Sequence, residues 1–95
     1  MELKVIRRQP RNEAVAVVFV LPANHPHAPV SVVGDFNEWQ PFRHPMIERP
    51  DGTLSTTVLF SQGTTVRFRY LGRDGFWFDD PDADIIDSEG GIIHV

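Results

Sequence analysis

Carboxylates and imidazoles are the side chains of this chain best suited to hold a metal ion. The stretch Asp80–Asp84 has an acid at every second position, as the start of a calcium-binding loop does. Such a loop needs glycine at its sixth position and glutamate at its twelfth, where this chain has Ile85 and Gly91. His25 and His27 could chelate a transition metal, but no third ligand lies near them in the sequence. We therefore predict no metal site and no cofactor.

The sequence carries no recognisable catalytic motif. It lacks the nucleophile elbow of serine hydrolases, the His-Glu-x-x-His zinc motif and a phosphate-cradling glycine loop. A glycosidase would need two carboxylates held across a substrate cleft. Asp79–Gly91 is rich in acids, but a solvated acidic loop is the simpler interpretation of such a segment. We predict that the protein is not an enzyme and has no catalytic residues.

Two tryptophans and an arginine are the strongest candidates for a binding site. Trp39 and Trp77 each follow a turn, and strand alternation places Trp77 outside if Phe76 and Phe78 point inward. Arg69 lies on the polar side of its own strand. An exposed indole beside a guanidinium suits a sugar ring, which has an apolar face and a hydroxyl rim. A tryptophan in a small β-protein is more often part of the core, so this pattern alone leaves both interpretations open.

The elements that must position these residues are β-strands. No segment repeats its apolar positions with a helical period, and β-branched residues are frequent. The expected strands are Leu3–Ile6, Ala14–Leu21, Val30–Gly34, Thr53–Phe60, Thr64–Leu71, Phe76–Phe78 and Ile92–Val95. Asp35–Asp51 and Asp79–Gly91 are expected to be loops. About seven short strands predict one all-β antiparallel β-sandwich over residues 1–95, with residues 1–13 as a loosely ordered first strand.

Composition and charge argue against several classes of partner. The chain has 9 bases and 13 acids, and its bases are scattered, so it does not fit a nucleic-acid binder. The longest apolar run, Ala14–Leu21, has eight residues, whereas a membrane helix needs about 20. The first ten residues contain no apolar signal region, and there is no cysteine. We expect a cytoplasmic protein with neither a nucleic-acid nor a membrane partner.

Several short motifs follow one another from about Ala14 to the C-terminus. They are Val30-Ser-Val-Val-Gly-Asp-Phe-Asn-Glu-Trp39, Val66-Arg-Phe-Arg-Tyr70, Asp74-Gly-Phe-Trp77, Asp80-Pro81 and Ile92-Ile-His-Val95. In this order and spacing they resemble a family 48 carbohydrate-binding module, the immunoglobulin-like early-set domain of isoamylases and glycogen branching enzymes. The glycogen-binding module of the AMP-activated protein kinase beta subunit belongs to the same family. The resemblance implies an immunoglobulin-like sandwich that binds α-glucan.

The resemblance also implies roles for individual residues. It places sugar stacking on Trp39 and Trp77, and hydrogen bonding of sugar hydroxyls on Arg69. Glucan-binding members carry a longer loop before the last strand, in which an apolar residue, a threonine and an asparagine grip the sugar. Here the loop Asp82–Gly91 is shorter and acidic, and Gly90 stands in the place of the asparagine. We therefore expect this loop to add only repulsion of anionic sugars.

These observations predict a non-catalytic module that binds α-1,4-glucan weakly, as glycogen, starch or maltooligosaccharide. The alternative is a protein-interaction or adaptor domain on the same fold that has lost sugar binding and associates with a glycogen-metabolising enzyme or another protein. A third possibility is that the aromatic residues only pack and the domain has no ligand, because a fold by itself does not determine function.

Overall fold

The structure, a computed structural model, describes residues 4–11 and 14–95, with side chains from residue 14 onward. Its strands are β1 (Lys4–Arg11), β2 (Ala14–Leu21), β3 (Ser31–Gly34), β4 (Ile47–Glu48), β5 (Leu54–Ser61), β6 (Thr65–Leu71), β7 (Trp77–Phe78), β8 (Ile85–Asp87) and β9 (Gly90–His94). Two single turns of 3-10 helix, η1 (Asp35–Asn37) and η2 (Arg73–Gly75), follow β3 and β6. Among these described residues, none forms a helix long and apolar enough to cross a bilayer.

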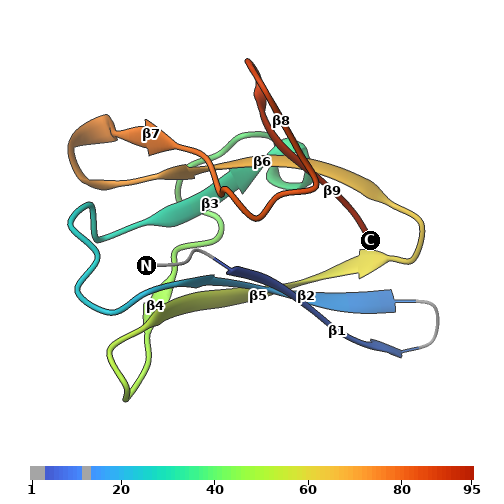
Figure 1. Cartoon of the computed structure of the whole chain (residues 1–95), viewed down its shortest axis with the longest axis horizontal. Coiled ribbons are helices and arrows are strands. Elements are labelled where there is room, and N and C mark those ends of the chain that lie inside the picture. The colour runs from blue at the N-terminus through green and yellow to red at the C-terminus, as the bar shows by residue number, and fades with distance from the viewer. Residues whose placement is uncertain (1–3, 12–13) are drawn as a thin grey trace.

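The strands form two antiparallel sheets that pack face to face (Figure 1). The first sheet has the order β1-β2-β5-β4, and the second has the order β3-β6-β9-β8 with β7 paired to β6. Without the short strands β7 and β8, this is the immunoglobulin arrangement of four strands against three. The prediction of an all-β, immunoglobulin-like antiparallel β-sandwich is therefore confirmed.

The core lies between the two sheets. Its largest contributions come from alternate residues of the central strands β2 and β6, which are Val15, Val17, Phe19, Leu21, Val66, Phe68 and Tyr70. The rings of Phe19 and Phe68 meet edge to face across the interface, with their centroids 5.0 Å apart. Because every second residue of β6 is buried, the residues between them face outward, as the sequence predicted for Arg69.

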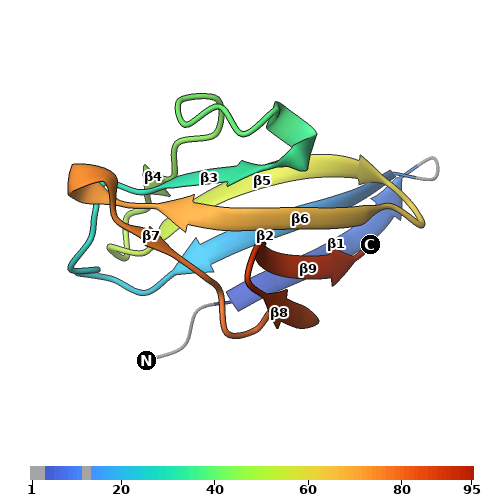
Figure 2. The ribbon, with the colours of Figure 1, turned by 90° about the horizontal axis from the view of Figure 1, so that it is seen from above.

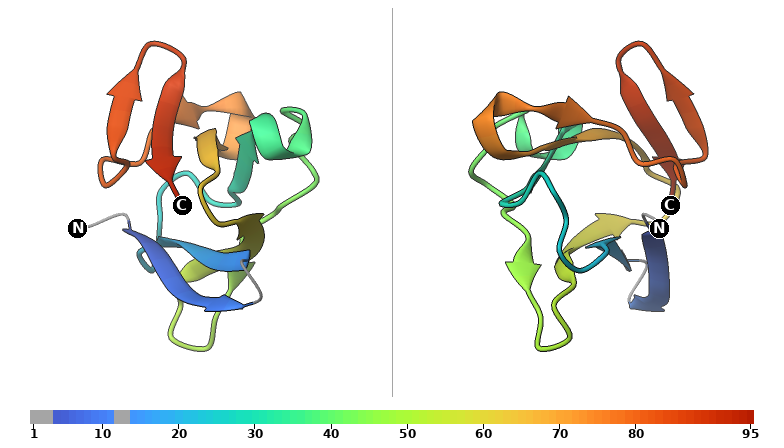
Figure 3. Two further views of the ribbon diagram at one scale, coloured as in Figure 1. Left: turned by 90° about the vertical axis from the view of Figure 1, so that its right-hand side faces the viewer. Right: turned by 60° about the vertical axis from the view of Figure 1, so that its left-hand side comes forward.

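Two segments that were expected to be loops contain strands. β4 lies within Asp35–Asp51 and pairs with β5, and β8 lies within Asp79–Gly91 and pairs with β9. The expectation was wrong because neither short run has a strand pattern of its own. Each becomes a strand by forming backbone hydrogen bonds to its partner strand. β8 and β9 form a hairpin closed by the two residues between Asp87 and Gly90, and this hairpin projects from the body of the domain (Figure 3).

The first strand is longer than predicted. It extends to Arg11 and pairs with β2 along its length, with an irregular register between Arg7 and Pro10. Residues 1–3 and 12–13 lie outside the described residues, so the loose order expected over residues 1–13 stays a prediction.

Candidate functional site

The outer face of the second sheet carries Arg69 and Trp77. β6 lies between β3 and β7 (Figure 2). Val33 of β3 is opposite Arg69, and Trp77 of β7 is opposite Leu71. Side chains directly opposite one another in a sheet point to the same face. Arg69, Leu71 and Trp77 therefore share one surface, on which Arg69 and Trp77 are diagonal neighbours within reach of long side chains.

Trp77 is exposed over 44% of its surface, as its predicted outward position requires. Phe78 packs against the core and lies 5.2 Å from Tyr70 between ring centroids. Phe76, whose inward position was a condition of that prediction, is 47% exposed. The condition holds for Phe78 only, because β7 begins at Trp77 and strand alternation does not extend to Phe76.

A cluster of four rings anchors the hairpin that carries Trp77. His27 stacks on Phe76 with a centroid distance of 4.0 Å, and His25 stacks on Phe78 at 5.2 Å. The backbone N–H of Arg73 also donates to the carbonyl of His27 over 2.7 Å. The pKa of His25 is lowered, mainly by burial and also by the charge of the neighbouring His27. Sequence reasoning treated these histidines as ordinary loop residues, since nothing local indicates that they meet a hairpin far along the chain.

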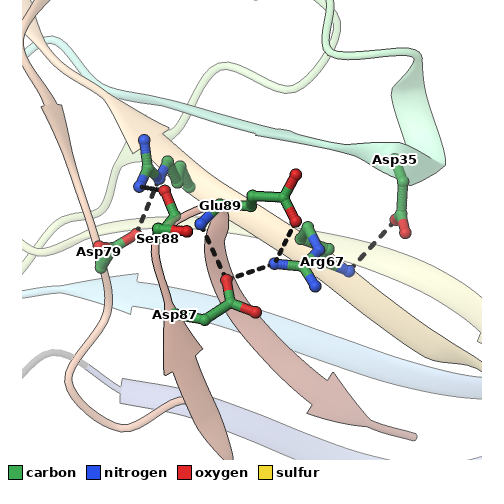
Figure 4. A network of polar contacts seen from close by, with 7 residues as sticks. Asp35, Arg67, Asp79, Asp87, Ser88 and Glu89 are labelled. Atoms are coloured by element: carbon green, nitrogen blue, oxygen red, sulfur yellow. Dashed lines mark hydrogen bonds and ion pairs between the residues drawn. The ribbon is translucent and has the colours of Figure 1, made fainter.

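The guanidinium of Arg69 is held in place by the segment that follows β7. Its Nε donates to Asp79 over 3.1 Å, and its Nη2 donates to the backbone carbonyl of Ser88 over 2.9 Å (Figure 4). Arginine has five N–H donors, so these two bonds orient the planar group and leave three others for a ligand. The tip of the β8–β9 hairpin is thus part of the site.

Arg67 fastens the same hairpin to β6. Its Nη1 pairs with Asp87 and lies 4.0 Å from Glu89, and its backbone N–H donates to Asp35 over 3.3 Å (Figure 4). The hydrogen bond to Asp87 raises the pKa of Arg67, and the same bond lowers the pKa of Asp87. The expectation that the loop Asp82–Gly91 only repels anionic sugars stays a prediction. The structure adds that Asp79 and Asp87 bind the two outward-facing arginines of the central strand.

Asp80 belongs to the core rather than to an acidic surface. It is fully buried, and its carboxylate accepts hydrogen bonds from the Tyr70 hydroxyl over 2.7 Å and from the backbone N–H of Asp82 over 2.9 Å. Burial raises the pKa of Asp80, and it raises that of Tyr70 well above its ordinary value. In the part of the chain that the structure describes, no three potential metal ligands come together.

Trp39 lies on the loop that leaves β3, directly after η1. Its backbone N–H donates to the carbonyl of Gly34 over 2.9 Å, and its side chain is 39% exposed. Glu38 and Trp39 both have left-handed backbone conformations, with φ of 58° and 57°. Each such residue costs about 1–2 kcal/mol, so the fold must hold this turn by other contacts.

Asn37 supplies those contacts. This buried amide accepts from the backbone N–H of Gly34 over 3.0 Å and donates to the carbonyl of Val32 over 3.0 Å. Its Nδ2 also lies 2.9 Å from His44 Nδ1. The pKa of His44 is lowered, mainly by burial and also by the positive charge of Arg43. The sequence showed no partner for His44, because the turn that brings Asn37 to it exists only in the folded chain.

Strand register therefore places two of the three predicted residues on one face. Arg69 and Trp77 lie on the paired strands β6 and β7, while Trp39 lies on the loop that leaves β3. Neither indole stacks on another aromatic ring within residues 14–95. The outer face consequently presents the half-exposed indole of Trp77 and one oriented guanidinium, an arrangement that can stack on a flat apolar surface and donate hydrogen bonds at its edge.

Comparison with known proteins finds a partial similarity to two curated enzymes. No protein-family model matches the chain. Two curated proteins, both described as 1,4-alpha-glucan branching enzyme GlgB 2 and from two strains of Xanthomonas campestris pv. campestris, are each 48% identical to it over 58 residues. The match covers 61% of this chain and 8% of each relative, so the chain spans only a small part of their length.

Proposed function

We propose that this chain is a non-catalytic module that binds α-1,4-glucan, such as glycogen, starch or maltooligosaccharide, through Trp39, Arg69 and Trp77. The observation that carries the proposal is the half-exposed indole of Trp77 beside an arginine whose guanidinium is already oriented. The partial identity to enzymes named for their action on 1,4-alpha-glucan supports the choice of sugar. The proposal places the module in the cytoplasm, beside glycogen.

Each residue has a separate task in this proposal. The indole faces cover the apolar C–H face of a glucosyl ring, which removes apolar surface from water. The three uncommitted N–H groups of Arg69 donate to ring hydroxyls. Because Asp79 and Ser88 hold the guanidinium before the sugar arrives, less side-chain entropy is lost on binding.

The expected affinity is low, because the platform covers one face of the sugar. A short maltooligosaccharide should bind at about millimolar concentration, or about −4 kcal/mol. A branched polymer presents many chain ends, so it should retain the protein much better through repeated contact.

Electrophoresis in a native gel cast with glycogen tests the proposal. Wild-type protein should be retarded, and soluble maltoheptaose should release it. Trp77→Ala should migrate as in a gel without glycogen, whereas Leu59→Ala should stay retarded, since Leu59 is 63% exposed on the outer face of the other sheet. Equal retardation of both variants would show that Trp77 does not bind glucan.

A second candidate is an adaptor that contacts a glycogen-metabolising enzyme or another protein. It is favoured by the outer face of the first sheet, where the outward side chains of β2 and β5 that reach solvent are uncharged: Ala14, Ala16, Val18, Val20, Thr57, Leu59 and Ser61. Exposed apolar patches often mark protein contacts. Co-elution with a glycogen branching enzyme that Leu59→Glu abolishes, together with no retardation by glycogen, would support this candidate over the first.

A further inference from the structure

A groove opens next to Trp77 on the same face of the sheet. It encloses about 290 Å³ between β3, the end of β6 and the loop that follows η1. Its lining includes Ser31 and Leu71, which are direct neighbours across β3 and β6. Leu71 is in turn the direct neighbour of Trp77 across β6 and β7. The groove and the proposed glucan platform therefore share a border at Leu71.

The lining of the groove favours an uncharged ligand with an apolar face. Most of it is apolar, formed by three proline rings and the side chains of Val30, Phe42, Met46 and Leu71, and its polar side chains are Ser31 and Arg73. Arg73 is its one charged lining residue, and its Nη2 already donates to the carbonyl of Pro26 over 3.2 Å. Small-ligand pockets usually combine an apolar lining with a few polar groups and measure about 300–1,000 Å³. This groove, near the lower end of that range, is suited to a sugar ring rather than to a folded segment of protein.

Phe42 is the unusual residue of this groove. It is 90% exposed, although a phenylalanine gains more from burial than most side chains. The other six phenylalanines each lie against another aromatic ring, whereas Phe42 has no aromatic partner among residues 14–95. Its ring is thus positioned at the rim of an apolar groove with a face that a ligand can cover.

We propose that this groove is a second glucosyl subsite, which continues the path of the glucan from Trp77 over Leu71 to Phe42. The inference rests on the proposed function. Neighbouring strands are about 4.8 Å apart, so the path from Trp77 to Ser31 is about 10 Å long. A chain of several linked sugars spans that distance and a disaccharide on Trp77 does not. A ring stacked on Phe42 brings its hydroxyls toward Ser31 and Arg73, so the subsite selects for longer chains.

Affinity measured against chain length tests the subsite. Binding of maltose and of maltoheptaose is followed by NMR titration for the wild type, Phe42→Ala and the control Leu59→Ala. Phe42→Ala should weaken maltoheptaose binding about three- to tenfold, because it removes one aromatic contact with the sugar. It should leave maltose binding unchanged. Leu59→Ala should change neither. An unchanged affinity of Phe42→Ala for maltoheptaose, or an equal loss for both sugars, would overturn the subsite.

Two further measurements keep this result separate from the proposed function. Trp77→Ala should weaken both sugars, and if it weakens neither, the proposed function fails whatever Phe42→Ala does. In the wild type, maltoheptaose should shift the amide resonances of Ser31, Leu71 and Arg73, while maltose should leave Ser31 and Arg73 unshifted. If Trp77→Ala abolishes binding and maltoheptaose leaves Ser31 and Arg73 unshifted, only the second subsite is wrong.

Discussion

Replacement of Asn37 by alanine should destabilise the domain and also detach the turn that carries Trp39. The Asn37 amide satisfies the backbone N–H of Gly34 and the carbonyl of Val32, and it contacts His44. Alanine would leave two buried backbone groups without these partners. A buried polar group left unpaired costs about 1–3 kcal/mol, so the free energy of unfolding should fall by about 2–6 kcal/mol. A domain of this size has about 5–14 kcal/mol in total, so the loss is a large fraction of its stability.

Urea unfolding followed by tryptophan fluorescence measures this loss, and two variants serve as comparisons. Asn37→Asp keeps an oxygen for the Gly34 N–H but sets a buried carboxylate oxygen against the Val32 carbonyl, so at neutral pH it should lose at least as much stability as Asn37→Ala. Gln40→Ala alters an exposed residue three positions along and should stay within about 0.5 kcal/mol of the wild type. If Asn37→Ala also stays within about 0.5 kcal/mol, the amide does not hold this turn and the reasoning is refuted.

Other perturbations test the platform and its supports. Trp39→Ala and Trp77→Ala should lose glycogen retention with little loss of stability by urea unfolding, whereas removal of a core tryptophan would cost about 3–5 kcal/mol. Arg69→Lys should weaken maltoheptaose binding in an NMR titration although the charge remains, because an ammonium lacks the planar fork of donors. Binding that falls steeply with added salt would instead point to a charged partner. Stability should fall as the pH drops below about 6.5, because the folded-state pKa values of His25 and His44 lie below those of the unfolded chain. Urea midpoints measured across pH should show a smaller fall for His44→Asn than for the wild type, and an identical fall would exclude His44 as a cause.

Local patterns in the sequence were enough for most of the fold. Strand alternation depends only on nearest neighbours, so the run in β6 predicted both the strand and its buried side, whereas the uniformly apolar run in β2 predicted only the strand. The same rule placed Arg69 and Trp77 on the outside. It failed at Phe76, which lies before the first paired residue of β7, and at β8, whose strand character comes from β9.

Local sequence patterns are enough to predict the sandwich, its central strands and the residue types that suit an aromatic binding face. Contacts formed in the folded chain bring the acidic segment to the two arginines, hold the turn of Trp39 through Asn37 and His44, and form a groove that borders Trp77 at Leu71. These features depend on contacts between residues far apart in the chain, such as Arg69 and Ser88, nineteen positions away. Alternation constrains which side of a strand a residue takes, but only the packing of distant segments decides which side chains meet there.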